Sequence, residues 1–150
     1  TIKKMVDYSN KNKPNKKDIK FINKDINKIN FKNSCIVSSF YSIQFISPKK
    51  RQILINKIYK DLNWGGAFFM VEKVRGPDAR FQDMISQVYL EYKLSQGYNS
   101  DEILSKSRSL KGVLEPFSSN ANLQMLKRSG FKDIFTVFKY CCFEGWLAIK

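Results

Sequence analysis

Residues 61–73 read DLNWGGAFFMVEK, and this stretch decides the fold. It passes from polar residues through Gly65 and Gly66 into an unbroken apolar run and ends on the charged pair Glu72-Lys73. An apolar run of this kind, bounded by turn residues, is typical of a strand that is buried on both faces of a parallel sheet. The glycine pair therefore predicts a helix that stops sharply and a buried strand over residues 66–74.

Two strands and a helix are predicted upstream of this stretch. Residues 19–23 predict a short strand, and residues 34–46, rich in β-branched and aromatic residues, predict a buried strand that runs into a loop. Pro48 suits the first turn of the helix that follows. One apolar stripe of that helix is expected to face the core: Ile53, Leu54, Ile58 and Leu62.

The first helix downstream is predicted from Pro77 and Asp78 to Gly97, because Pro suits a first turn and Asp an N-terminus. Its apolar positions have helical spacing, which is typical of a face packed on a core. The members of this expected core stripe are Phe81, Met84, Ile85, Val88, Tyr89 and Tyr92.

Two more helices are predicted from their end signals. Asn99 and Glu102 have the spacing of a capping box, and Ser118 or Ser119 is expected to cap the last helix. Cations followed by Gly130 favour a left-handed stop at the end of that helix.

The predicted order of elements indicates an α/β fold. It runs strand, strand, helix, strand, three helices and two strands, with residues 133–141 and 145–150 as an antiparallel hairpin. This order favours a mainly parallel sheet covered by helices, the second half of a doubly wound sheet. Because no G-x-G-x-x-G turn occurs, the first βαβ half is expected to be missing, and residues 1–150 are interpreted as the C-terminal portion of a single domain.

The positive charge of the chain is concentrated at its front. Lys and Arg number 27 against 13 Asp and Glu, and residues 1–60 hold 15 of the basic residues but only 3 of the acidic ones. A basic surface of this kind is one signature of nucleic-acid binding. A general bias towards Lys, Asn and Ile is the other explanation, and the scarcity of arginine favours it.

Several classes of site are excluded by composition. The chain has no histidine, which rules out histidine-based nucleophilic or general-base catalysis. Its three cysteines, Cys35, Cys141 and Cys142, offer neither a disulfide framework nor metal-ligand spacing, so no metal site is expected. No apolar stretch approaches a membrane span and the start is unlike a signal peptide, so a cytoplasmic location is expected.

Residues 62–66, LNWGG, resemble the Leu-x-Pro-Gly-Gly turn before the fifth strand of class I S-adenosylmethionine-dependent methyltransferases. The surrounding residues resemble one branch of that superfamily, the carboxy-S-adenosyl-L-methionine synthases, and match only the larger C-terminal part of those enzymes. The residues that carry this likeness are Gln44-Phe45, Arg51-Gln52, Lys57-Ile58-Tyr59, Leu62, Gly65-Gly66-Ala67, Glu72-Lys73, Gly97-Tyr98, Glu102-Ile103, Leu110, Val113 and Gly130-Phe131.

The resemblance implies a Rossmann-like fold and a role in the modification of the tRNA wobble uridine. In the chemistry proposed for the family, the sulfonium methyl of S-adenosylmethionine loses a proton, the ylide captures carbon dioxide that leaves prephenate, and phenylpyruvate is released. The implied cofactor is S-adenosylmethionine or its carboxylated form, and the implied partners are prephenate and a second copy of the chain. Neither nucleic acid nor a membrane is required. Without the glycine-rich turn, these 150 residues are expected to bind the cofactor weakly or not at all.

Four residues are candidates for the site by this resemblance. Asp25 and Ile26 match the pair that borders the adenine, although Asp25 could instead cap a turn. Phe40 stands where the family has an asparagine near the cofactor, so only its backbone could contribute. Arg108, after a local shift of one residue, matches the arginine of a Lys-Arg-Ser-x-Leu segment. A guanidinium is the planar, permanent cation that suits a transferred carboxylate, so Arg108 is the candidate for both catalysis and cofactor binding.

Two other functions stay open at this point. An ordinary methyltransferase of a small molecule or RNA would share the fold and the Gly-Gly turn. A basic RNA-binding module, built on the lysine-rich front, would bind in a strongly salt-dependent way. The pair Glu72-Lys73 could line a ligand site at the edge of the sheet or lie at a solvated strand end.

Overall fold

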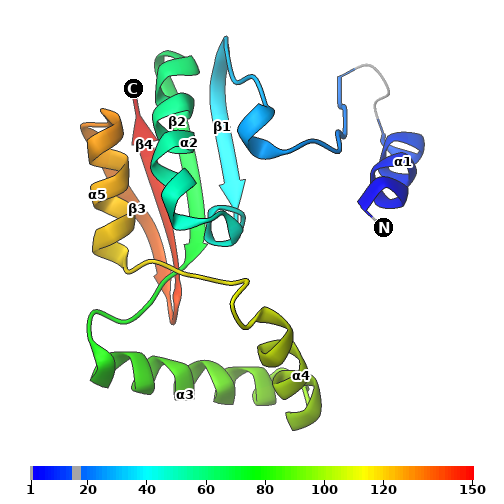
Figure 1. The fold of residues 1–150 in the computed structure, drawn as a ribbon, viewed down its shortest axis with the longest axis vertical. Coiled ribbons are helices and arrows are strands. Elements are labelled where there is room, and N and C mark those ends of the chain that lie inside the picture. The colour runs from blue at the N-terminus through cyan, green and yellow to red at the C-terminus, as the bar shows by residue number, and fades with distance from the viewer. Residues whose placement is uncertain (1, 15–17) are drawn as a thin grey trace. The chain divides into compact units, whose positions relative to one another are not determined.

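The computed structural model describes residues 2–14 and 18–150 (Figure 1). Its contacts divide the chain into two units, residues 1–30 and residues 31–150. Lys16 and Lys17, which belong to the predicted lysine-rich front, lie outside the described residues.

The first unit contains helix α1, Ile2–Asn12, and the short 3-10 helix η1, Ile26–Lys28. The strand predicted over residues 19–23 is wrong, because this segment is irregular. The side chain of Asn10 explains the difference at Phe21: it donates to the Phe21 carbonyl at 2.7 Å and accepts from the Phe21 N–H at 3.0 Å. Both backbone groups that a strand would give to a neighbour are therefore already bonded.

The second unit is built on a four-stranded mixed sheet in the order β1-β2-β4-β3. Its strands are β1, Ser34–Phe40; β2, Leu62–Lys73; β3, Asp133–Tyr140; and β4, Phe143–Ile149. The two strands that enclose helix α2, Pro48–Asp61, are parallel, whereas β4 is antiparallel to both of its neighbours. This arrangement confirms the predicted α/β fold and its terminal hairpin, but the described sheet is mixed rather than mainly parallel, because only the β1–β2 pairing is parallel.

The core lies on one face of this sheet, beneath α2 and α5, Ser119–Ser129 (Figure 1). Phe131, directly after α5, stacks on Phe68 of β2 with ring centroids 6.2 Å apart. The predicted stripe of α2 is confirmed except for Ile53, which is 66% exposed because the helix turns Ile55 inward instead. The fully buried apolar side chains of this face include Leu54, Ile55, Ile58, Phe68, Met70, Met125, Leu126, Phe131 and Trp146.

The other two helices are α3, Ala79–Ser95, and α4, Ser100–Leu110. The expectation that the apolar stripe of α3 is core is wrong, because the described residues bury no residue of α3. Phe81, Met84, Val88 and Tyr92 are all exposed, while Ile85 and Tyr89 are half-buried. Helical spacing predicts an apolar face but not what covers it, and Figure 1 shows α3 below the sheet rather than against the face that α2 and α5 cover.

The predicted N-caps and the left-handed stop at Gly130 are confirmed, although α3 ends at Ser95, two residues before the predicted Gly97. Asp78 accepts from the Phe81 N–H, Asn99 forms the capping box with Glu102, and Ser118 caps α5. Gly130 takes the left-handed conformation, φ 114°, at the end of α5. No helix among the described residues is both long and apolar enough to cross a membrane.

The strand predicted over residues 34–46 ends earlier and is less buried than expected. Within the part of the chain that the structure describes, Ser39 is the only buried residue of β1, and Phe40 at its end is 55% exposed. This strand lies at the edge of the described sheet, so one of its sides has no strand neighbour there. On the sheet face opposite α2 and α5, Phe135 of β3 is 68% exposed among the described residues.

The glycine pair of the deciding stretch lies inside β2, after α2 has already ended at Asp61, so its predicted role in stopping the helix is wrong. The pairing of β2 with β1 begins at Leu62, and its register shifts between Ser34 and Ile36, close to Gly65, which has a φ of 72°. A Cβ on Gly66 would lie 2.8 Å from the Asn63 carbonyl oxygen, closer than side-chain carbons come. These two positions therefore favour glycine because they lie in the irregular stretch of β2 where its register with β1 shifts.

Candidate functional site

The candidate site lies at the carboxyl ends of β1 and β2, where ligands bind in open α/β sheets. The two parallel strands end at the same edge, with Phe40 opposite Val71. Beyond β1 the chain passes Tyr41 and forms the 3-10 helix η2, Ile43–Phe45, while β2 ends at Lys73.

Glu72 fixes the turn at η2. Its carboxylate accepts backbone N–H bonds from Ser42 at 3.2 Å and Ile43 at 3.0 Å through Oε1, and from Gln44 at 3.0 Å through Oε2. Burial raises the pKa of Glu72, and the three N–H bonds and Arg51 oppose part of that shift. Glu72 is thus a structural anchor, so the solvated-end explanation of the pair Glu72-Lys73 is wrong for this residue.

Arg51 of α2 holds the other side of the same turn. Its Nε donates to the Ile46 carbonyl at 2.7 Å and an Nη donates to the Gln44 carbonyl at 3.0 Å. The buried guanidinium also lies 4.3 Å from the ring centroid of Phe117. Burial lowers the pKa of Arg51, while Glu115 and Glu72 raise it.

Two neighbouring cavities lie at this edge. The larger, about 920 Å³, is walled by the turn after β1, by Lys73, by α3 and by α4. The smaller, about 380 Å³, is lined by Lys73, Lys93, Lys106, Arg108 and Lys111 together with polar and apolar groups of residues 107–114. Both cavities share Lys73, Lys93, Lys106, Leu110 and Leu114.

The side chains that line the larger cavity are mainly aromatic and cationic. Phe143 of β4 contacts two tyrosine rings edge-on, with its centroid 5.5 Å from that of Tyr41 and 5.3 Å from that of Tyr89. The remaining aromatic lining residues are Phe45, Tyr92 and Tyr98. A planar organic anion is the kind of molecule that such a lining suits.

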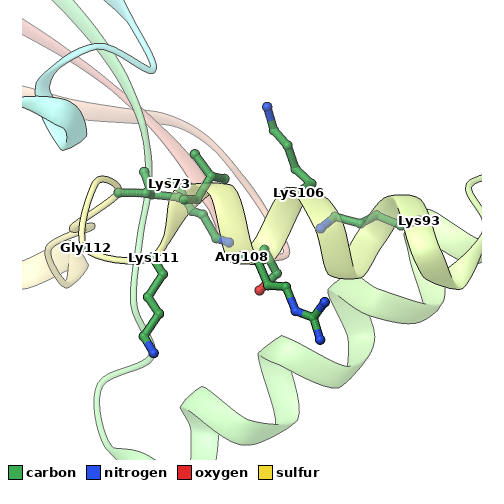
Figure 2. A pocket seen from close by; sticks show the side chains of 9 residues that line it. Lys73, Lys93, Lys106, Arg108, Lys111 and Gly112 are labelled. Atoms are coloured by element: carbon green, nitrogen blue, oxygen red, sulfur yellow. The ribbon is translucent and has the colours of Figure 1, made fainter.

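The cations of the smaller cavity form no ion pair among the described residues. The ion pairs found among the described residues are Lys57–Asp61 and Lys139–Glu144. Neither pair contains a residue that lines the smaller cavity. Figure 2 shows Lys73 and Lys93 directed towards each other, with Lys106 pointing away from them. The cluster is therefore suited to bind an external anion.

Of the residues that the sequence predicts for the site, Arg108 lines a cavity and Phe40 does not. Arg108, in the last turn of α4, lines the smaller cavity. Phe40 lines neither cavity; its ring packs edge-on against Phe69, with centroids 5.5 Å apart, and the next residue, Tyr41, reaches the larger cavity. Arg108 and the segment after Phe40 thus serve the same sheet edge.

Asp25 and Ile26 lie in the first unit. Oδ1 of Asp25 accepts from the backbone N–H and the side-chain amide of Asn27, both at 2.9 Å, and so caps η1. Ile26 is half-buried.

Sequence reasoning missed Lys93 and the site role of Tyr89. The sequence predicts Tyr89 in the core, and Lys93 belongs to none of the helix caps or motifs identified in the sequence. The spacing of the two residues was the available signal, since an aromatic residue and a lysine four apart on a helix lie on the same face. Among the described residues, no group of three or more acidic, cysteine or histidine side chains could hold a metal ion.

The hairpin behind the larger cavity carries the adjacent cysteines, which are free thiols. Cys142 is buried and its carbonyl accepts from the Val74 N–H at 2.7 Å. Burial raises the pKa of the Cys142 thiol to about 11.

We expect a disulfide reagent at pH 8 to modify Cys35 rapidly and Cys142 only as the protein unfolds, because Cys35 is exposed and Cys142 is buried and protonated. Stopped-flow measurement of thiol release checks this. Cys35→Ser should remove the fast phase, whereas Cys142→Ser should leave it intact. Loss of the fast phase in Cys142→Ser would contradict the expectation.

Comparison with solved structures defines the class of fold. The chain matches human N-acetylserotonin methyltransferase in complex with S-adenosylmethionine with a TM-score of 0.62, at 15% identity, over 97% of this chain and 37% of that one. It also matches an O-methyltransferase family 2 protein from Planctomyces limnophilus with a TM-score of 0.55, at 15% identity, over 85% of this chain and 34% of that one. The fold is therefore the Rossmann-like fold of class I S-adenosylmethionine-dependent methyltransferases, and this chain covers about a third of each of these two solved proteins.

Curated relatives narrow the similarity to one family. The chain is 45% identical to the carboxy-S-adenosyl-L-methionine synthase of Campylobacter lari over 120 residues, which are 80% of this chain and 51% of the relative. It is 39% identical to the synthase of Staphylococcus epidermidis over 133 residues, 89% of this chain and 58% of the relative. These values confirm the predicted resemblance to carboxy-S-adenosyl-L-methionine synthases, and the chain spans somewhat more than half the length of those relatives. No protein-family model matches it.

Proposed function

We propose that the chain is the C-terminal portion of a carboxy-S-adenosyl-L-methionine synthase, a cytoplasmic enzyme that carboxylates S-adenosylmethionine with prephenate for tRNA wobble-uridine modification. The observation that carries the proposal is a cluster of cations, unpaired among the described residues, beside an aromatic cavity at the carboxyl edge of the sheet. Prephenate is a ring with two carboxylates, and the product keeps one of them on the cofactor. Similarity to the named synthases supports the same assignment.

In this proposal Arg108 holds the carboxylate that is transferred. Its guanidinium is permanently charged and can bind a carboxylate through two hydrogen bonds. Asp25 accepts from the adenine amino group, Ile26 packs on the adenine ring, and the backbone at Phe40 contacts the cofactor. S-adenosylmethionine supplies the acidic sulfonium methyl group. Bonds to its ribose and to the rest of its amino-acid part come from residues that match the other half of the relatives.

The proposed reaction conserves atoms and charge. The bond between the prephenate ring and its carboxyl carbon breaks, and the carbon forms a bond to the former methyl carbon of S-adenosylmethionine. The ring becomes aromatic as its hydroxyl group leaves, and that group takes the methyl proton to form water. A pocket that excludes bulk water and fixes both reactants favours this transfer over the loss of carbon dioxide to solvent.

A chimera tests the proposed function. This chain replaces the matching part of the Campylobacter lari synthase, and the purified protein is incubated with S-adenosylmethionine and prephenate. We expect phenylpyruvate and carboxy-S-adenosylmethionine by mass spectrometry, and a dimer in sedimentation, as the resemblance implies. The unmodified 150-residue chain should bind S-adenosylmethionine weakly or not at all in calorimetry.

A folded chimera that releases no phenylpyruvate, while the intact Campylobacter lari enzyme does, would contradict the proposed function. An ordinary methyltransferase is the second candidate, which the fold of the solved neighbours favours. That candidate predicts S-adenosylhomocysteine with a methyl acceptor and no dependence on prephenate.

A further inference from the structure

Lys73 and Lys93 present two ammonium groups to one tyrosine ring. The Nζ of Lys73, at the end of β2, lies 4.7 Å from the ring centroid of Tyr89, and the Nζ of Lys93, in α3, lies 4.3 Å from it. The two nitrogens are therefore at most about 9 Å apart, since each is close enough to the ring for a cation–π contact. Two successive elements, β2 and α3, thus bring like charges to one place.

The positive charge of this pair is not compensated within the described residues. Neither lysine takes part in an ion pair there, and the carboxylate among the lining residues, Glu102, accepts the Asn99 N–H in the capping box. Burial lowers the pKa of Lys93, and the neighbouring charge of Lys73 lowers it further. Like charges held together without a counter-ion favour the binding of an anion between them.

The position of the pair separates it from Arg108. Both lysines line the larger, aromatic cavity and the smaller one, whereas Arg108 lines only the smaller one. A ligand whose ring lies among Tyr41, Tyr89 and Phe143 could therefore direct one carboxylate to the lysine pair and another to Arg108. A monocarboxylate with the same ring would meet only the first of these groups.

We propose that Lys73 and Lys93 form the binding site for the 2-oxo acid carboxylate of an aromatic or cyclohexadienyl substrate, the carboxylate that remains on the released product. The inference rests on the proposed function for the identity of the substrate. It adds that two carboxylates are bound by different cations: the retained one by the lysine pair and the transferred one by Arg108. The backbone of Lys73 is fixed for this task, because its N–H donates to the side-chain oxygen of Gln44 at 2.9 Å.

Calorimetry of the 150-residue chain with two probes separates these roles. Prephenate carries both carboxylates, and phenylpyruvate carries only the retained one. Lys73→Met and Lys93→Met should each raise the Kd of both probes about tenfold, the loss expected for one charge-assisted contact. Arg108→Met should raise the Kd of prephenate and leave that of phenylpyruvate unchanged.

Two controls keep the test specific. Lys127→Met removes an exposed lysine of α5 that lines neither cavity, and should change neither Kd. Lys93→Arg keeps the charge and should keep most of the affinity. Melting temperatures of all variants should stay near that of the parent chain, since Lys73 and Lys93 are only half-buried.

The possible results distinguish the proposed function from the proposed role of the lysine pair. If both probes bind and only Arg108→Met raises the Kd of prephenate, the proposed role of the lysine pair is overturned and the proposed function stands. If the lysine variants weaken phenylpyruvate as expected but the chimera does not transfer a carboxyl group, the pair stands and the proposed function fails. An equal loss with Lys127→Met, or no binding of either probe to the parent chain, overturns the lysine pair.

Discussion

Trp146→Ala should lower the free energy of unfolding by about 4 kcal/mol, the cost of removing the largest fully buried side chain among the described residues. Trp146 lies in β4, between its register partners Met70 of β2 and Thr136 of β3, and is 0% exposed. The substitution leaves a cavity in the core on the face of the sheet that α2 and α5 cover. A domain stabilised by about 5–15 kcal/mol would lose a large part of its stability. Urea denaturation followed by circular dichroism measures the change.

The chain provides a matched control in its other tryptophan. Trp64 is 88% exposed, so Trp64→Ala should change the free energy of unfolding by less than about 0.5 kcal/mol. Trp146→Phe should cost less than half as much as Trp146→Ala, because Phe refills most of the volume and the indole N–H has no hydrogen-bond partner to lose among the described residues. Equal effects of the two tryptophan-to-alanine substitutions would contradict the assignment of the core to this face.

The sequence predicts correctly the helix ends that depend only on residues nearby in the sequence. The cap residues Asp78, Asn99 and Ser118 bond to backbone N–H groups within a few residues, so their role does not depend on the rest of the fold. Gly130 acts equally locally, because a left-handed residue ends a helix wherever that helix lies.

The predictions that are wrong concern whether an apolar surface is covered by another part of the structure. The stripe of α3 and the residues of β1 have the composition of buried elements, yet the described residues do not cover them. Helical period and β-branched content report a preference for burial, whereas burial itself depends on a neighbour.

The candidate site was predictable only where a motif marked it. Arg108 was found from its segment and from the chemistry of a guanidinium, and the structure places it at a cavity. Lys93 belongs to no motif, and its importance depends on the approach of Lys73 from another element. Glu72 was seen as an edge residue, although its three backbone partners lie about thirty positions earlier in the chain.

Glu72→Ala should lower the free energy of unfolding by about 3 kcal/mol at pH 7, because it leaves three backbone N–H groups without their acceptor. Two of these groups belong to the buried residues Ile43 and Gln44. The loss should also loosen η2, and with it the wall of the larger cavity formed by Gln44 and Phe45. Urea denaturation gives the stability. Glu91→Ala, at an exposed position of α3, is the control and should change it little.

The pH dependence distinguishes a buried anchor from a surface carboxylate. Burial raises the pKa of Glu72 in the folded chain above its ordinary value of 4.5, so the folded state holds the proton more tightly than the unfolded state. The stability that this linkage contributes is fully present below the unfolded pKa and is lost as the pH rises through the folded one. The gap between the parent chain and Glu72→Ala should therefore be larger at pH 4.5 than at pH 7. A gap that widens with rising pH would mean that the N–H bonds outweigh burial and lower the pKa of Glu72 instead.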